Sequence, residues 1–211
     1  MNNPLQVVKS QVHRPPGRPR RSPEREAEIR GRVANIAARL FRDEGLAAVS
    51  MRRIASEAQV SPMSLYDYFR SKNEIIRAIW ERFFSECFEL VESAAARCKR
   101  EPRRKLEAAC VAYVRYWLDH PDEYRAVFMI EDKIENRERY FVETSAIITR
   151  YQIFSDLLNA HQPGSKSNAQ SDRAAALICA LTGVCHMLVT VSEFRWPAAT
   201  QLLKQLMRMV D

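Results

Sequence analysis

The residues of this chain best suited to chemistry are hydroxyl, apolar and basic side chains gathered within residues 50–72. Ser61, Pro62, Met63 and Ser64 form the centre of the group. Serine hydroxyls can hydrogen-bond to base edges, and apolar groups can contact thymine methyls. Side chains suited to holding phosphates surround them: Ser50, Arg52, Arg53, Tyr66, Tyr68 and Lys72. These residue types predict contact with DNA.

Two short helices joined by a sharp corner are predicted to position these side chains. Ser50 can cap the first helix through its hydroxyl, which accepts an orphan backbone N–H. The stretch Gln59-Val60-Ser61 leaves too little chain for anything but a tight turn. Ser61 then caps the second helix, and Pro62 takes its first position, where a missing N–H costs nothing. The pattern is a helix-turn-helix, whose second helix enters a DNA major groove.

A family resemblance starts from the same segment. The run LYDYFRSKNEII at residues 65–76 resembles the motif of TetR-type transcriptional regulators, as does RIASEA at residues 53–58. The resemblance implies an all-α protein, with an N-terminal three-helix helix-turn-helix DNA-binding domain and a larger helical ligand-binding and dimerisation domain. Gln59 stands at the turn position where the family usually has Gly. A left-handed backbone conformation there costs a residue with a side chain, such as Gln, roughly 1 kcal/mol.

Three parts are expected along the chain. Residues 1–23 hold five basic residues, five prolines and no acidic residue, which predicts a disordered basic arm. Its Arg18 and Arg20 suit the minor groove of A·T-rich DNA, and a plain electrostatic tail explains them equally well. Residues 24–71 are the predicted helix-turn-helix domain, and residues 72–211 the predicted effector-binding and dimerisation domain.

Successive helices are expected throughout the ordered part. Ser22 and Pro23 predict the start of the first helix, and Gly45 its end. Beyond Ser71, helices are expected at about residues 72–98, 102–119, 121–130, 134–160, 172–194 and 198–210, with a loop over 161–171. No strand alternation or internal repeat stands out.

Charge distribution and composition limit the classes of function that this chain can have. The first 80 residues hold 15 Lys/Arg and 8 Asp/Glu, so the whole net charge of +7 lies beside the helix-turn-helix, where it can neutralise phosphates. The five cysteines lack zinc or disulfide spacing, and no signal peptide is visible, so we expect a cytoplasmic protein. The sequence shows no phosphate-binding loop, nucleophile motif or metal-ligand spacing, so we expect no enzyme activity, no cofactor and no metal.

One apolar segment could be either a membrane-spanning helix or a buried helix of the protein. Residues 174–191 carry no formal charge, at the lower limit of a spanning helix. Thr182, His186 and Thr190 fall on one polar stripe at four-residue spacing. A buried helix in a helical dimer explains this better, so no membrane partner is expected.

An effector pocket is a candidate role for the body. The resemblance implies a second domain that binds a small molecule and dimerises through its last two helices. The candidate pocket residues are Tyr113, Trp117, Phe128, Tyr151, Phe154, Thr182 and His186. They suit a flat or acyl-type, weakly polar compound. Plain core packing explains each of them singly, and redox sensing by Cys179 or Cys185 is a further alternative.

The sequence therefore predicts a sequence-specific DNA-binding transcriptional regulator. It is expected to bind a double-stranded DNA operator as a homodimer, and to act as a repressor that a small-molecule effector releases. The alternative is a constitutive architectural DNA-binding protein without an effector, which would show little sequence preference.

Overall fold

The computed structural model describes residues 22–99, 101–129, 146–163 and 167–210, and within these ranges the chain forms helices and no strand. The predicted all-α fold class is confirmed. In chain order the helices are α1 (Pro23–Glu44), α2 (Met51–Glu57), α3 (Pro62–Tyr68), α4 (Lys72–Arg97), α5 (Pro102–Asp119), α6 (Pro121–Phe128), α7 (Ala146–Arg150), α8 (Gln152–His161), α9 (Ser167–Thr190) and α10 (Ala199–Val210).

Side-chain caps start the N-terminal helices at the predicted residues. The hydroxyls of Ser22, Ser50 and Ser61 each accept a hydrogen bond from the backbone N–H three residues on. Each cap satisfies one of the four N–H groups that a helix start leaves without a partner. Gly45 ends α1 with a φ of 82°, and its N–H donates to the Phe41 carbonyl oxygen. Local sequence thus sets these boundaries.

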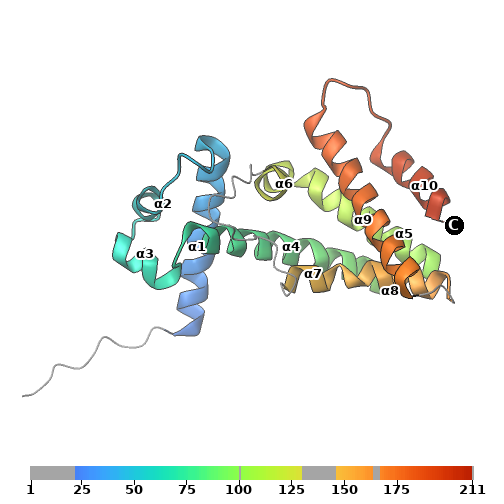
Figure 1. The fold of residues 1–211 in the computed structure, drawn as a ribbon, viewed down its shortest axis with the longest axis horizontal. Helices are drawn as coiled ribbons and strands as arrows, with labels where there is room; N and C mark the ends of the chain where they lie inside the picture. Colours follow the sequence, from blue (N-terminus) through green and yellow to red (C-terminus); the bar gives the residue numbers. More distant parts are fainter. Residues whose placement is uncertain (1–21, 100, 130–145, 164–166, 211) are drawn as a thin grey trace, which may run out of the picture.

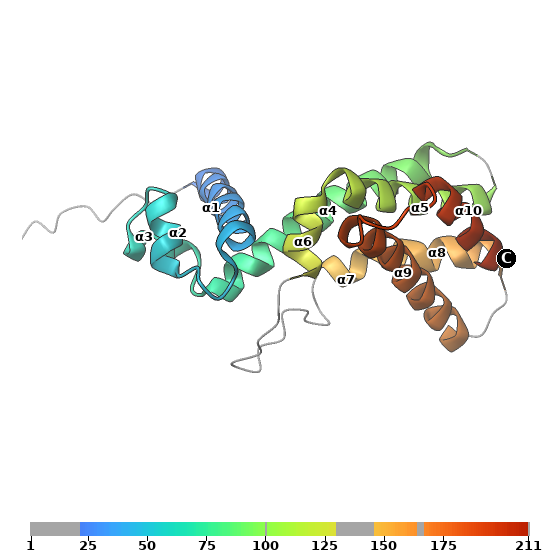
Figure 2. The same ribbon diagram turned by 90° about the horizontal axis from the view of Figure 1, so that it is seen from above.

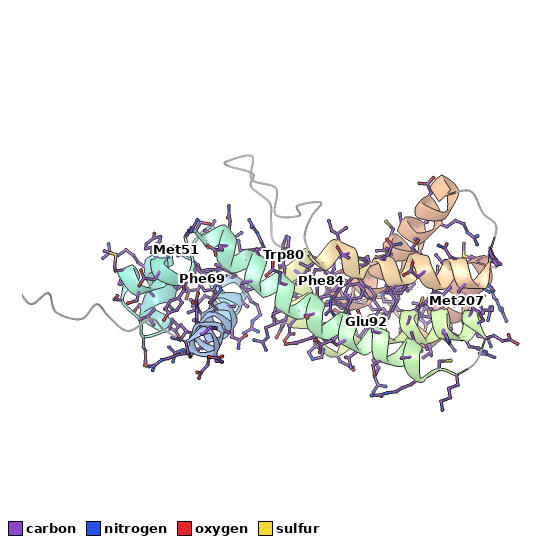
Figure 3. The ribbon with its side chains drawn as sticks, turned by 90° about the horizontal axis from the view of Figure 1, so that it is seen from below. Met51, Phe69, Trp80, Phe84, Glu92 and Met207 are labelled. Atoms are coloured by element: carbon purple, nitrogen blue, oxygen red, sulfur yellow. The ribbon has the colours of Figure 1, made fainter. Side chains whose placement is uncertain are left out.

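Helix α4 joins two parts of the molecule. Figure 1 shows α1, α2 and α3 grouped at one end, with α4 running from them into the body formed by α5 to α10. Along α4, Trp80 lies nearer the three N-terminal helices, and Phe84 and Glu92 lie within the body (Figure 3). Buried residues of both parts form one continuous cluster. The division into domains at residue 71 stays a prediction.

Several helix boundaries predicted for the body are wrong. The helix expected at 134–160 lies partly outside the described residues, and its described part is interrupted at Tyr151, between α7 and α8. The loop expected over 161–171 ends earlier, because α9 already begins at Ser167. Its Ser and Asn residues suit a helix start as well as a loop.

The end of α9 also comes earlier than predicted, at Thr190 instead of residue 194. The Thr190 hydroxyl donates to the His186 carbonyl oxygen at 2.6 Å. The indole N–H of Trp196 donates to the Val191 carbonyl oxygen at 2.8 Å. The Arg125 guanidinium donates to the Val189 carbonyl oxygen at 3.2 Å, and a helix continuing to residue 194 would have bonded that carbonyl to the Glu193 N–H.

The corner between α2 and α3 carries the predicted backbone strain. Gln59 has a φ of 55°, the one positive value among described non-glycine residues. We expect Gln59→Gly to raise the free energy of unfolding by about 1 kcal/mol, because glycine adopts this conformation without a steric penalty. Thermal or urea unfolding measures the change. Gln59→Ala, which keeps a Cβ, is the control and should give no such gain.

Candidate DNA interface and effector core

Helix α3 exposes the residues predicted to contact bases. The side chain of Met63 is 77% exposed, Ser61 and Pro62 are also exposed, Tyr66 is 49% exposed, and Ser64 is half-buried. The Ser61 hydroxyl caps the helix by accepting from the Ser64 backbone N–H at 3.0 Å. It also donates to the Ser64 hydroxyl at 2.9 Å. The Ser64 hydroxyl hydrogen can therefore be offered to an acceptor on DNA.

The outward placement of Tyr68 is wrong. Its side chain is only 6% exposed and belongs to the core with Leu65 and Phe69. Its carbonyl oxygen accepts a hydrogen bond from the Arg30 guanidinium of α1. Leu65 and Tyr68 are three residues apart, so they fall on the same side of the short helix. The phosphate contact predicted for Tyr68 has no exposed side chain to make it.

Two neighbouring arginines on α2 differ in their surroundings. Arg53 forms ion pairs with Glu57 and Glu44, each with an N···O distance of 2.8 Å. The hydrogen bond to Glu57, and then that to Glu44, raises the pKa of its guanidinium. The side chain of Arg52 is exposed, and it makes no hydrogen bond or ion pair with the described residues. Arg52 is therefore the arginine available to a phosphate.

Arg52→Ala should weaken operator binding on all sequences and reduce the slope of log affinity against log salt by about one unit. Arg53→Ala should change the slope less, because two carboxylates already hold that guanidinium. Arg115→Ala, on an exposed arginine of α5, is the control for the loss of one charge. Fluorescence anisotropy across a salt series gives the slopes. Equal slopes for Arg52→Ala and Arg53→Ala would contradict this assignment.

Lys72 begins α4, and its ammonium group contacts the loop between α1 and α2. Its Nζ atom donates to the carbonyl oxygens of Leu46 at 2.8 Å and of Val49 at 3.2 Å. An ammonium has three donors, so one remains for a phosphate. Lys72 thus stabilises the loop that leads to the Ser50 cap, a role that the sequence did not indicate. Arg18 and Arg20, predicted for the minor groove, lie outside the described residues.

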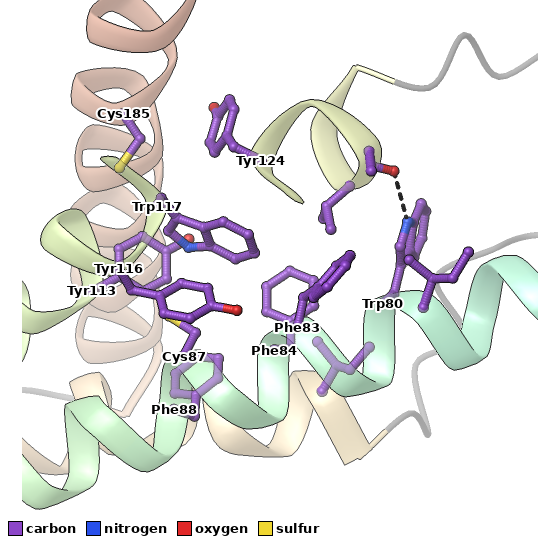
Figure 4. Packing of buried hydrophobic residues seen from close by; sticks show 14 of the residues in the cluster. Trp80, Phe83, Phe84, Cys87, Phe88, Tyr113, Tyr116, Trp117, Tyr124 and Cys185 are labelled. Carbon is purple, nitrogen blue, oxygen red and sulfur yellow. Dashed lines mark hydrogen bonds between the residues drawn. The ribbon is translucent and has the colours of Figure 1, made fainter. Parts of the chain in front are cut away.

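Five of the predicted pocket residues meet in one aromatic cluster. Tyr113, Trp117 and Phe154 are fully buried, and Phe128 and Tyr151 are partly exposed. The ring centroids of Tyr113 and Trp117 lie 6.3 Å apart, those of Trp117 and Phe128 5.3 Å, and those of Tyr113 and Phe154 5.8 Å. Figure 4 shows the Trp117 indole near Tyr113, Phe84 and Tyr124. We call this group, with Phe84, Phe88 and Tyr124, the aromatic core.

Phe84 and Phe88 were missed by the sequence analysis. Both project from α4, and they contact Tyr151 with ring-centroid distances of 5.9 and 4.8 Å. Their four-residue spacing marks one face of a helix, which was the available signal. That spacing does not tell which other helix the face meets.

A small hydroxyl cluster borders the aromatic core. The Tyr113 hydroxyl lies 3.1 Å from the Tyr151 hydroxyl and 3.3 Å from the Thr182 hydroxyl. Burial raises the pKa of both tyrosines well above the usual value. These groups are therefore neutral donors and acceptors at physiological pH. Thr182, from α9, is thus placed beside the core as predicted.

His186 is not part of this core. It is exposed on α9, and its ring centroid lies 6.2 Å from that of Tyr124, which is 1% exposed. The predicted pocket placement of His186 is wrong, because Tyr124 stands between it and the buried rings. A step of four residues rotates a helix by 400°, so His186 is turned about 40° away from Thr182. It is exposed, while Cys185 of the same turn is buried.

The cysteines give no support to redox sensing. Cys185 is buried, and burial raises the pKa of its thiol to about 12. A thiol of that pKa holds almost no thiolate at neutral pH, and thiolate is the reactive form. Cys179 is exposed on α9.

Helix α6 connects the aromatic core to α1, which packs with the helix-turn-helix formed by α2 and α3. Asp122, in its first turn, forms an ion pair with Arg42 of α1 at 3.1 Å. The indole N–H of Trp80 donates to the Ala126 carbonyl oxygen at 3.4 Å. From the same helix, Phe128 contacts Trp117 inside the core. Figure 2 shows α6 between α1 and the remaining helices of the body.

Two family models match the chain. The model described as bacterial regulatory proteins of the tetR family matches residues 35–79. The model described as a tetracyclin repressor-like C-terminal domain matches residues 106–210.

Curated relatives match over part of the chain. The HTH-type transcriptional activator FasR of Mycolicibacterium smegmatis is 33% identical over 102 residues, 48% of this chain and 46% of FasR. The HTH-type transcriptional repressor KstR2 of the same organism is 33% identical over 67 residues, 32% of this chain and 33% of KstR2. The matched segments thus span less than half the length of these relatives. Both are named as transcriptional regulators.

Solved structures match over most of the chain. A putative tetR family transcription regulator from Shewanella sp. PV-4 superposes with a TM-score of 0.66 and 16% identity, over 85% of this chain and 95% of that one. KstR2 of Mycobacterium tuberculosis superposes with a TM-score of 0.54 and 21% identity, over 86% of this chain and 92% of that one. At such identities the likeness shows the fold. With both family models matched, this chain belongs to the TetR family of transcriptional regulators, which are DNA-binding proteins and not enzymes.

Proposed function

We propose that the protein binds a specific DNA operator, represses transcription there, and leaves the DNA when a small effector binds in the body. TetR-family regulators bind DNA operators and small-molecule effectors and act as dimers. The observation that carries the proposal is the start of α3, where Met63 is 77% exposed and Ser64 partly exposed, together with Arg52 of α2, which is exposed and makes no ion pair with the described residues. This combines one apolar and one hydrogen-bonding base contact with a phosphate contact.

Operator recognition is assigned to the start of α3. The side chains of Ser61 and Ser64 would hydrogen-bond to base edges, while Pro62 and Met63 would contact thymine methyls. Ser50, Arg52, Tyr66 and Lys72 would hold phosphates and fix the orientation of the helix. Two copies related by a two-fold axis would read half-sites about one helical turn apart.

Effector release needs a connection between the two parts of the molecule. Helix α6 supplies one, because Phe128 packs in the aromatic core while Asp122 holds Arg42 of α1. Helix α4 supplies a second, since Phe84 lies in the same core. A ligand shifts the equilibrium only if it binds the released conformation more tightly than the DNA-bound one. A ligand that separates the core rings would move α6 and α4 together.

The basic arm is proposed to add affinity through the minor groove. Deleting residues 1–21 should reduce affinity more for operators with A·T-rich flanks than for those with G·C-rich flanks, because arginines prefer the narrow A·T groove. Binding titrations on two operators that differ only in their flanks measure this. An equal loss on both would make the arm a generic polycation.

The function as a whole is tested by nuclease protection of DNA upstream of genes neighbouring its own, with and without a compound panel. We expect one palindromic segment to be protected and one compound class to abolish the protection. The curated relatives include an activator and a repressor, so transcription from that promoter has to be measured in parallel. Protection without sequence preference, which no compound relieves, would instead support a constitutive architectural protein.

A further inference from the structure

Trp117 carries a buried hydrogen-bond donor that has no partner among the described residues. Its side chain is 0% exposed, and among the described residues its Nε1 is the one buried side-chain donor left unsatisfied. The other two tryptophans have acceptors: Trp80 donates to the Ala126 carbonyl oxygen at 3.4 Å and Trp196 to the Val191 carbonyl oxygen at 2.8 Å. Leaving a buried donor unsatisfied costs about 1–3 kcal/mol. An acceptor that arrives with a ligand would recover this free energy.

The surroundings of the indole are aromatic. Its nearest rings belong to Tyr116, Phe128, Phe84 and Tyr124, with centroid distances of 5.0, 5.3, 5.5 and 5.8 Å, all edge to face. An N–H pointing at a ring face gains less than a conventional hydrogen bond. An oxygen acceptor would therefore still compete successfully for this donor.

The same region lacks a counter-charge for an ionised ligand. Among the described residues, no charged side chain is buried. The described contacts of the indole itself are with rings, and the titratable Glu86 and His120 side chains contact Tyr116 and not the indole. Burying an unpaired carboxylate there would be strongly unfavourable. A neutral carbonyl oxygen has the required lone pairs without that penalty.

We propose that Trp117 Nε1 is the anchoring donor of the effector site, and that the effector is an uncharged, largely apolar compound presenting a carbonyl-type oxygen to it. This rests on the proposed effector-release function. The effector's apolar part replaces contacts among the aromatic rings, and its oxygen satisfies the indole N–H. The hydroxyl cluster offers a second polar contact on the Tyr113 side.

The test uses the full chain labelled with ¹⁵N-tryptophan and a matched probe series. The probes are aryl methyl ketones with one, two and three rings, the corresponding ethyl arenes, and the corresponding carboxylates. The three indole N–H resonances are assigned by their loss in Trp80→Phe, Trp117→Phe and Trp196→Phe. We expect at least one ketone to move the Trp117 resonance downfield, and the ethyl arene of the same size to leave it without a downfield shift.

Calorimetry on the same samples measures the affinities. The best ketone should bind about tenfold more tightly than its ethyl counterpart, the ratio expected for one hydrogen bond to an otherwise unsatisfied donor. Trp117→Phe should reduce that ratio to within about twofold, while Trp196→Phe should retain it, because that indole already donates to Val191. The carboxylates should bind more weakly than the ethyl arenes.

Three results would overturn the proposal: no ketone moves the Trp117 resonance of the wild-type chain, the ketone preference survives in Trp117→Phe, or a carboxylate binds most tightly. Operator release is measured in parallel. A ketone that binds at Trp117 without releasing DNA supports the proposed binding site and contradicts the proposed effector release. A compound that releases DNA equally from wild type and Trp117→Phe supports effector release and contradicts this site.

Discussion

Gly183→Leu is expected to convert the protein from a dimer into a stable monomer. Gly183 is exposed on α9, and apart from its chain neighbours and the local helix backbone no described atom lies within 4 Å of the position that a Cβ would take. A side chain there fits the single chain, and replacing glycine inside a helix adds up to about 1 kcal/mol of stability. In a close helix pair across a two-fold axis, the same side chain would overpack the contact.

The exposed face of α9 supports this expectation. Gly183 lies on a stripe with Ala176, Cys179 and Met187, all exposed, at helical spacing. The segment Asp172–Thr190 is long and apolar enough to cross a membrane by length and composition, yet only 28% of it is buried within the chain. The family acts through dimers. We therefore propose that a second copy covers this face.

Overpacking costs about 1–3 kcal/mol per protomer, so the dimer dissociation constant should rise on the order of 100-fold. Sedimentation at micromolar concentration and thermal unfolding measure the two effects. Operator affinity should fall with dimerisation. Gly31→Leu, in α1 and equally unobstructed, is the matched control and should leave the oligomeric state unchanged. A Gly183→Leu protein that remains dimeric would place the interface elsewhere.

Lys72→Met is expected to weaken both the fold and DNA binding. Methionine keeps most of the apolar stem but removes the donors to the carbonyl oxygens of Leu46 and Val49. Hydrogen bonds from a charged group are worth about 1.5–3 kcal/mol, and the free energy of unfolding should fall by that amount. Loss of a phosphate contact should also reduce the salt slope of DNA binding by about one unit.

The two effects of Lys72→Met separate its two roles. Urea unfolding measures the first and salt-dependent anisotropy the second, and Arg52→Ala serves as the comparison because its side chain makes no hydrogen bond with the described residues. Arg52→Ala should change the salt slope and leave stability within about 0.5 kcal/mol. If Lys72→Met lowered stability with an unchanged slope, Lys72 would be a structural residue and not a phosphate ligand.

Features that depend on neighbours in sequence were predicted correctly. The serine caps, the Gly45 stop and the left-handed Gln59 each involve groups within four residues. The family motif near α3 predicted the helix-turn-helix, which the structure contains. The boundaries of α9 were less predictable, because Ser, Asn and Thr satisfy backbone groups at helix ends and in loops alike.

The sequence by itself determined the class of protein, the position of the DNA-binding unit and the residues at the start of α3. It could not tell whether Arg52 or Arg53 is available to a phosphate, because an ion pair that distinguishes them joins Arg53 to Glu44, nine residues away in α1. It could not place Tyr68 or His186, since helical spacing groups residues on a face without telling which face is covered.

Only the tertiary structure decided which faces meet. It brought Phe84 of α4, Trp117 of α5 and Phe128 of α6 into one aromatic core, and left the Trp117 N–H without a partner among the described residues. It also directed Lys72 to a loop 26 residues earlier in the chain. Caps and turns follow from local hydrogen bonds, whereas packing and long-range ion pairs depend on the arrangement of all the helices at once.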